Sequence, residues 1–192
     1  FRIISVGSLV WVKGYEYALQ AVALLKRQGI QVKYEIIGSG QERNRILYTI
    51  RDLELDDCVM LSGYLDSEQV LLHLRHADVF LHAAVSEGFS NAVLEAQAVQ
   101  LPVVCFDVGG LPENVENGQT GFVVPLRDHA AMAQALLKLW HSPDLRNRMG
   151  SAGREKVLKL FTLKNQVGQF HELFLHAARV NSDPSFTKPE GS

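Results

Sequence analysis

The sequence has almost no excess charge of either sign, and this balance argues against a nucleic-acid partner. Its 19 lysines and arginines nearly match its 21 aspartates and glutamates, and the formal net charge is -2. Proteins that bind nucleic acids through their phosphates carry a clearly basic surface. We therefore expect no nucleic-acid partner.

Long apolar runs and cysteines are also scarce. No apolar run approaches the roughly 18 residues that are needed to span a bilayer. The two cysteines, Cys58 and Cys105, each lie in a short apolar run, so we expect buried thiols and no disulfide. The seven histidines are scattered without the spacing of metal ligands, so we expect no metal site.

Six short apolar runs, each typical of a buried strand, alternate with amphipathic helical patterns. The runs cover residues 2–7, 31–37, 58–61, 78–82, 102–106 and 121–124. Crossovers that contain a helix connect parallel strands, and such crossovers are right-handed. The sequence therefore predicts an α/β fold, with a Rossmann-like parallel sheet of about six strands flanked by helices.

One domain is expected over residues 1–178, and its last amphipathic segment covers residues 162–178. Residues 179–192 have little apolar content and contain two prolines. A segment of this composition cannot bury enough apolar surface to offset its ordering entropy. We expect it to be a disordered tail.

A parallel sheet binds ligands at the carboxyl ends of its strands, and the most informative motif lies at such a place. Glu87-Gly-Phe-Ser-Asn-Ala-Val-Leu-Glu95 follows the fourth apolar run and begins a helix. The amides near Phe89, Ser90 and Asn91 are expected to face outward at the N-terminus of this helix, where free N–H groups and the helix dipole attract an anion. The two glutamates would flank the anion and accept hydrogen bonds from hydroxyl groups on either side.

Two other interpretations of this motif stay open. A glycosidase acid pair needs carboxyl groups about 5 to 9.5 Å apart, whereas eight residues of helix separate Glu87 from Glu95 by roughly 12 Å. That separation favours two contacts along an elongated ligand. In the simpler structural alternative, Glu87 is a solvated acid in the loop, and Glu95 is an acid on the helix face that pairs with a lysine.

The order of the motifs resembles that of the retaining GT-B glycosyltransferases of the group 1 type. Glu87 and Glu95 match the E-x7-E motif of that family, and Gly7 to Lys13 match its first phosphate loop. Other matching segments follow in the family's order at residues 36–40, 59–63, 77–79, 102–104, 109–113 and 117–121. The resemblance covers about residues 2–150 and implies the C-terminal, donor-binding half of a GT-B fold.

The resemblance also implies a role for each matching position. Glu87 and Lys13 would be catalytic, because Glu87 holds hydroxyls of the donor sugar and Lys13 offsets charge on the leaving diphosphate. Glu95 would bind the ribose hydroxyls. The other implied donor-binding residues are Gly7 and Ser8 in the phosphate loop, Phe89, Ser90 and Asn91 at the helix, and Tyr64 and Leu65 beside the base.

The implied donor is a UDP-, GDP- or ADP-sugar, with no further cofactor, and the implied reaction is transfer with retention of the anomeric configuration. The acceptor would bind to a missing N-terminal domain, so the chain alone is expected to bind nucleotide without transferring sugar. The family usually has an arginine where this chain has Ser8, which reduces the charge at the phosphate. A non-catalytic binding module therefore stays open. A nucleotide-sugar epimerase of the same architecture also stays open, although the E-x7-E motif argues against it. The expected location is cytoplasmic, and peripheral membrane association of the full-length protein stays open.

Overall fold

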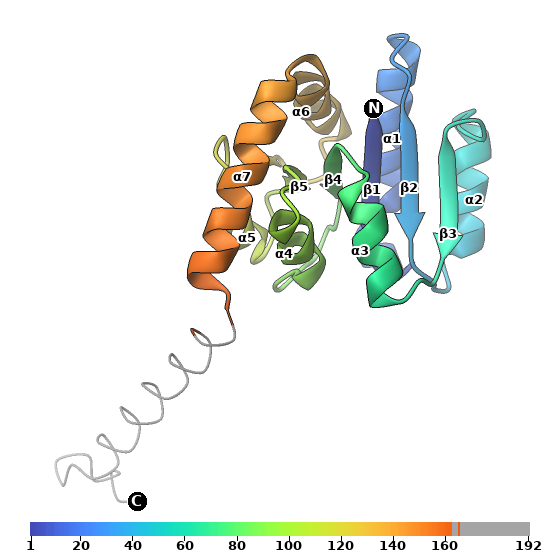
Figure 1. The fold of residues 1–192 in the computed structure, drawn as a ribbon. Coiled ribbons are helices and arrows are strands. Elements are labelled where there is room, and N and C mark those ends of the chain that lie inside the picture. The colour runs from blue at the N-terminus through green and yellow to red at the C-terminus, as the bar shows by residue number, and fades with distance from the viewer. Residues whose placement is uncertain (163–164, 166–192) are drawn as a thin grey trace, which may run out of the picture. The chain divides into compact units, whose positions relative to one another are not determined.

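The computed structural model describes residues 1–162 and 165, and six parallel strands form the sheet at its centre (Figure 1). The strands are β1 (Arg2–Val6), β2 (Lys33–Ile37), β3 (Val59–Gly63), β4 (Val79–His82), β5 (Val103–Phe106) and β6 (Gly121–Val124). Their order across the sheet is β3-β2-β1-β4-β5-β6, and all neighbouring pairs run parallel. This doubly wound order confirms the predicted fold class, and the direction of winding reverses between β1 and β4.

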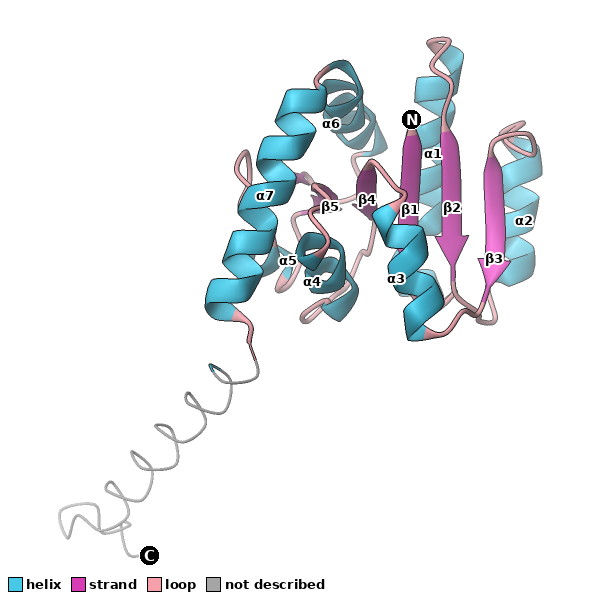
Figure 2. Ribbon diagram, in the orientation of Figure 1, coloured by secondary structure: helices cyan, strands magenta, loops and turns pink. Residues whose placement is uncertain are grey.

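Helices connect the successive strands, and two more helices follow β6 (Figure 2). They are a short 3-10 turn, η1 (Trp11–Lys13), and the α-helices α1 (Tyr15–Arg27), α2 (Arg43–Asp52), α3 (Ser67–Arg75), α4 (Asn91–Ala98), α5 (Leu111–Asn114), α6 (His129–His141) and α7 (Pro143–Leu160). Asp66 caps α3 in a capping box with Gln69, and Asp128 caps α6. The elements η1 and α5 were not expected, because three or four residues are too few to show a helical periodicity.

The core consists of two apolar clusters on opposite faces of the sheet. Adjacent strand residues point to opposite faces, and in β1 Ile3 joins the first cluster while Ile4 joins the second. The first cluster holds buried residues of α1, α2 and α6, and the second holds buried residues of α3, α4 and α5. Both faces of the sheet are therefore packed, and the carboxyl ends of its strands are held at fixed positions.

The chain divides into two units, residues 1–155 and 156–192. The sheet and all predicted site residues belong to the first unit. The predicted tail, and the segment 162–178 except for residues 162 and 165, lie outside the described residues. In the described part no helix has the length and apolar content to cross a membrane. Both cysteines are free thiols, but only Cys105 is fully buried; Cys58 is partly exposed because it lies just before the edge strand β3.

Candidate functional site

The predicted site lies where the loops after β1 and β4 meet, at the point where the winding of the sheet reverses. Gly14 ends η1 with a positive φ of 60°, and a Cβ atom there would lie 2.1 Å from the carbonyl oxygen of Ala83. Glycine thus allows the end of η1 to pack directly against the chain that leaves β4. This close approach brings Lys13 next to Glu87, although 74 residues separate them in the sequence.

Glu87 is held by two side chains that come from different elements. The Nζ atom of Lys13 donates to Oε2 of Glu87 at 2.5 Å, and Nε2 of His82 lies 3.0 Å from the same oxygen. The side chain of Glu87 is 13% exposed, that of Lys13 is 20% exposed and that of His82 is 5% exposed. Glu87 is therefore not a solvated acid in a loop.

The surroundings of Glu87 keep its carboxyl group ionised. Hydrogen bonds from His82 and from Lys13 lower the pKa of Glu87 from its ordinary value of 4.5 to about 2, against the opposing effect of burial. A general acid for glycoside hydrolysis needs a raised pKa. Glu87 therefore does not have the properties of the acid in a glycosidase pair.

The N-terminus of α4 differs in one respect from the expectation. Ser90 caps the helix, because its Oγ accepts a hydrogen bond from the amide of Val93. The amide of Ser90 donates to Oδ1 of the buried Asn114 at 3.1 Å. This amide therefore does not face outward as predicted, because α5 supplies an internal partner for it. The first helical residue, Asn91, is exposed, and its amide has no carbonyl four residues earlier within the helix.

The loop that carries Glu87 packs on the paired glycines after β5. A Cβ atom on Gly109 would lie 1.8 Å from the carbonyl oxygen of Glu87, and one on Gly110 would lie 1.8 Å from that of Gly88. The amide of Gly110 donates to the carbonyl oxygen of Glu87 at 3.2 Å. The segment 109–110 therefore fixes the backbone of the loop, while Lys13 and His82 fix the Glu87 side chain.

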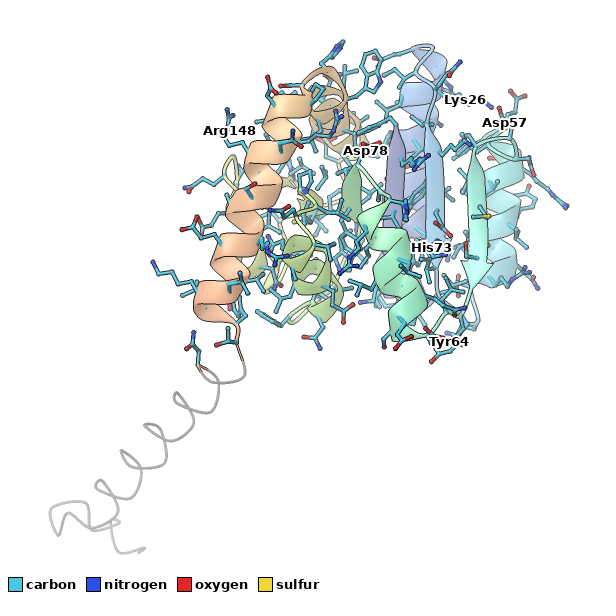
Figure 3. The ribbon with its side chains drawn as sticks, in the orientation of Figure 1. Lys26, Asp57, Tyr64, His73, Asp78 and Arg148 are labelled. Carbon is cyan, nitrogen blue, oxygen red and sulfur yellow. The ribbon has the colours of Figure 1, made fainter. Side chains whose placement is uncertain are left out.

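The remaining predicted residues lie along the same edge of the sheet. Glu95 and Ser8 are exposed. Within the described residues the Glu95 carboxylate has no hydrogen bond or ion pair. The alternative in which Glu95 pairs with a lysine on the helix face is therefore not found. Gly7 follows β1, and Phe89 is exposed in the loop before α4. Tyr64, which is 78% exposed (Figure 3), and the partly buried Leu65 follow β3. Because β3 is two strands from β1, these two residues lie roughly 10 Å further along the edge.

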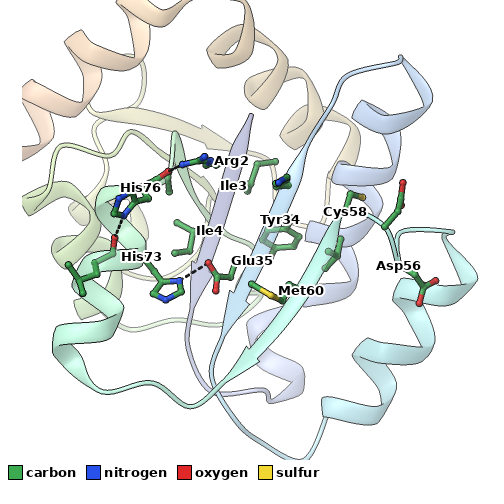
Figure 4. Close-up of a pocket in the computed structure, with 15 residues that line it drawn as sticks. Arg2, Ile3, Ile4, Tyr34, Glu35, Asp56, Cys58, Met60, His73 and His76 are labelled. Carbon is green, nitrogen blue, oxygen red and sulfur yellow. Dashed lines mark hydrogen bonds and ion pairs between the residues drawn. The ribbon is translucent and has the colours of Figure 1, made fainter.

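A cavity of about 810 Å³ lies elsewhere, between α3 and the strands β1 to β3 (Figure 4). Its lining includes Arg2 and Lys33, the first residues of β1 and β2, and the Glu35 and His73 pair, whose Oε2 and Nδ1 atoms are 2.9 Å apart. None of the predicted site residues lines it. Ligands of doubly wound sheets bind at the carboxyl ends of the strands, and this general rule favours the loops after β1 and β4 as the candidate site.

Two buried residues that contact the site were not predicted to act in it. Neither His82 nor Asn114 is among the candidate site residues of the sequence analysis. The one signal for His82 is a polar residue at the end of an otherwise apolar strand, five residues before Glu87. Asn114 gives no such signal, since its contact with Ser90 spans 24 residues and depends on the position of α5. Within the described residues, no group of three or more His, Cys, Asp or Glu side chains could hold a metal ion.

The fold and this edge define a Rossmann-like domain whose central loops carry a lysine, two glutamates and a helix N-terminus. The family model for glycosyl transferases group 1 matches residues 1–156. The chain therefore belongs to this family, as the motifs predicted.

A sequence relative agrees with this assignment, and two solved structures share the fold. The amylovoran biosynthesis glycosyltransferase AmsK of Erwinia amylovora is 38% identical over 144 residues, which cover 72% of this chain and 35% of AmsK. The structure of the pneumococcal O-GlcNAc transferase GtfA in complex with UDP and GlcNAc superposes with a TM-score of 0.78 at 24% identity, over 95% of this chain and 36% of GtfA. The crystallised C-terminal domain of the group 1 protein LpcC from Francisella tularensis has a TM-score of 0.76 at 22% identity, over 85% of this chain and 87% of that domain. The chain thus spans well under half of AmsK and GtfA, whereas it matches nearly all of an isolated C-terminal domain.

Proposed function

We propose that this chain is the donor-binding part of a retaining glycosyltransferase, which transfers a sugar from a nucleoside diphosphate sugar to an acceptor. The observation that carries the proposal is the Lys13–Glu87 pair beside the N-terminus of α4. This arrangement combines a cation and free helix amides, which suit a diphosphate, with carboxylates, which suit hydroxyl groups.

The diphosphate would bind at Asn91 and Lys13. A lysine ammonium has three N–H donors, so Lys13 can keep its hydrogen bond to Glu87 and still donate to a phosphate oxygen. Negative charge develops on the diphosphate as the bond to the sugar breaks, and a fixed cation together with the helix dipole stabilises that charge. Lys13 would therefore act both in binding and in leaving-group departure.

The two carboxylates would grip the ends of the donor. Glu95 has an exposed carboxylate that is not engaged by any described residue, so it is available to accept both hydroxyls of a ribose. Glu87 has one oxygen, Oε2, that already accepts from Lys13 and His82. Its Oε1 oxygen would accept hydroxyls of the donor sugar. Retention of configuration follows from the likeness to retaining enzymes and not from this geometry.

A titration of the chain tests the proposal. UDP, GDP and ADP are titrated separately by calorimetry, and we expect saturable binding of one of them. Lys13→Met and Glu95→Gln should each weaken that binding by about tenfold or more, which is the effect of losing one charge-assisted hydrogen bond. Lys33→Met and Glu155→Gln are matched controls, because both residues are exposed and lie away from the predicted site.

Two outcomes would contradict the proposal. One is the absence of binding to any of the three nucleotides by a folded chain. The other is binding that Lys13→Met and Glu95→Gln leave as unchanged as the controls do. Sugar transfer itself is expected only when the chain is joined to the remainder of its enzyme, since AmsK is almost three times as long as the matched region.

A non-catalytic binding module is the second candidate, and Ser8 is the observation that favours it. Ser8 brings no charge to the phosphate loop, so the site would stabilise a leaving diphosphate less well than one with an arginine there. Ser8→Arg distinguishes the two candidates. In an active transferase this variant should change the transfer rate of the full-length enzyme, whereas in a binding module it should change nucleotide affinity alone.

A further inference from the structure

Strand β4 ends on a buried imidazole that the proposed chemistry does not yet use. His82 is 5% exposed, and its ring stacks on that of Phe80 with an angle of 19° between the ring planes. The two residues share one face of the strand. The ring of His82 is therefore held by the packing of the sheet, whereas a side chain on a surface loop would be free to turn.

The hydrogen-bonding partner defines which nitrogen of His82 carries a proton. Glu87 is ionised and can only accept, so the Nε2 atom, 3.0 Å from Oε2, must be the donor. Burial lowers the pKa of His82, against the opposing effect of its hydrogen bond to Glu87. The ring is therefore neutral near pH 7, with its single N–H group directed at Glu87.

Lys13 alone would hold Glu87 less firmly. Its ammonium sits on a flexible four-carbon stem and presents three equivalent donors. Under the proposed function, at least one of these N–H groups turns to the diphosphate when the nucleotide sugar binds. Besides Glu87, His82 has no hydrogen-bonding partner among the described side chains, and its short side chain comes from a strand in the middle of the sheet.

We propose that His82 is a positioning residue for sugar recognition: its Nε2–H group fixes Oε2 of Glu87 and so presents Oε1 to the hydroxyls of the donor sugar. This inference rests on the proposed function, in which Glu87 contacts the sugar. It adds a residue that touches neither substrate nor leaving group. It also predicts that a substitution of His82 weakens the affinity for the sugar part of the nucleotide sugar and leaves the affinity for the nucleoside diphosphate nearly unchanged.

Three substitutions separate positioning from packing. His82→Gln retains an amide N–H at about the reach of Nε2, whereas His82→Asn places its amide nearer the position of Nδ1. His82→Leu places an apolar side chain of similar size there and removes the N–H group. Only the first variant should preserve the contact with Glu87. The Gln and Asn variants also keep the test valid if the Leu variant does not fold.

The first measurement is the histidine side-chain ¹⁵N spectrum of the wild-type chain. We expect the Nε2–H tautomer of His82, and a pKa below the ordinary value for histidine because the ring is buried. The Nδ1–H tautomer, or an imidazole that titrates near its ordinary pKa, would overturn the proposal. This measurement needs no ligand.

The second measurement compares a nucleotide with its sugar, using the pairs UDP and UDP-glucose, GDP and GDP-mannose, and ADP and ADP-glucose. In His82→Leu and His82→Asn the gain in affinity that the sugar provides should fall by about tenfold, while the affinity for the nucleoside diphosphate changes less than about twofold. His82→Gln should retain most of that gain. An equal loss for both ligands, no loss for either, or a Gln variant as weak as the Asn variant would each overturn the positioning role.

Failure of the proposed function gives a different result. If the wild-type chain binds none of the nucleotides, the site itself is wrong. If it binds a nucleoside diphosphate but none of the sugars adds affinity, Glu87 does not hold a sugar in this chain, and the positioning role of His82 fails while nucleotide binding stands.

Discussion

The Glu87 carboxylate should make the folded chain sensitive to acid, and substitution by glutamine should remove that sensitivity. Folding lowers the pKa of Glu87 from 4.5 to about 2, through the hydrogen bonds from His82 and Lys13. A carboxyl group with a lowered pKa in the folded state stabilises that state above its unfolded pKa, and the stabilisation is lost as the pH falls toward the folded pKa. A shift of this size corresponds to about 3 kcal/mol at pH 7.

Most of that stabilisation should disappear above pH 3. With pKa values of 4.5 unfolded and about 2 folded, about 2 kcal/mol is lost between pH 7 and pH 3. The free energy of unfolding is measured by urea titration at several pH values, for the wild type and for Glu87→Gln. The difference between the two proteins should shrink by about 2 kcal/mol over this range.

The control for this experiment is Glu155→Gln, which changes an exposed carboxylate on α7. Its curve should run parallel to that of the wild type. A Glu87→Gln curve that also runs parallel would refute the reasoning, because Glu87 would then not be held by Lys13 and His82. In the Lys13→Met background the effect of Glu87→Gln should be smaller, since one of the two hydrogen-bond donors is already absent.

Other predictions concern the residues around this pair. Gly110→Ala should destabilise the fold by about 1–3 kcal/mol and weaken nucleotide binding, because its Cβ atom would lie 1.8 Å from the carbonyl oxygen of Gly88. Gly88→Ala is the control, because its Cβ atom would meet nothing within 4 Å. In a thermal melt this control should lose less than about 0.5 kcal/mol of stability. Asn114→Ala should lower the free energy of unfolding by about 1–3 kcal/mol, because it leaves the Ser90 amide without its acceptor, and urea titration showing no loss would contradict this contact. Burial lowers the pKa of His82, so the folded state binds a proton at this ring less well than the unfolded state does. The free energy of unfolding should therefore fall as the pH drops below about 6.5, with a slope of at most about 1.4 kcal/mol per pH unit. This contribution to the slope should be absent in His82→Gln.

The sequence was sufficient to predict the elements that are long or strongly patterned. Runs such as 102–106 are apolar throughout because strands of a doubly wound sheet are covered on both faces, and all six predicted strands occur within two residues of their predicted bounds. The cap at Asp66 was predictable because capping depends only on neighbouring residues.

The contacts that define the site were less accessible from the sequence. The Lys13–Glu87 bond joins residues 74 positions apart, and it depends on the close packing of Gly14 on Ala83. The amide of Ser90 was expected to face an anion, but Asn114 accepts its hydrogen bond. No local pattern reveals which internal acceptor a helix amide will find, because that depends on where another element, here α5, lies in space.

A crystal structure of this chain with its preferred nucleotide sugar tests the central claim most directly. We expect the diphosphate within about 3 Å of the Asn91 amide and the Lys13 ammonium, with the ribose hydroxyls on Glu95 and the sugar hydroxyls on Oε1 of Glu87. A donor bound in the cavity between α3 and strands β1 to β3, or a diphosphate that touches neither Lys13 nor the start of α4, would contradict the account.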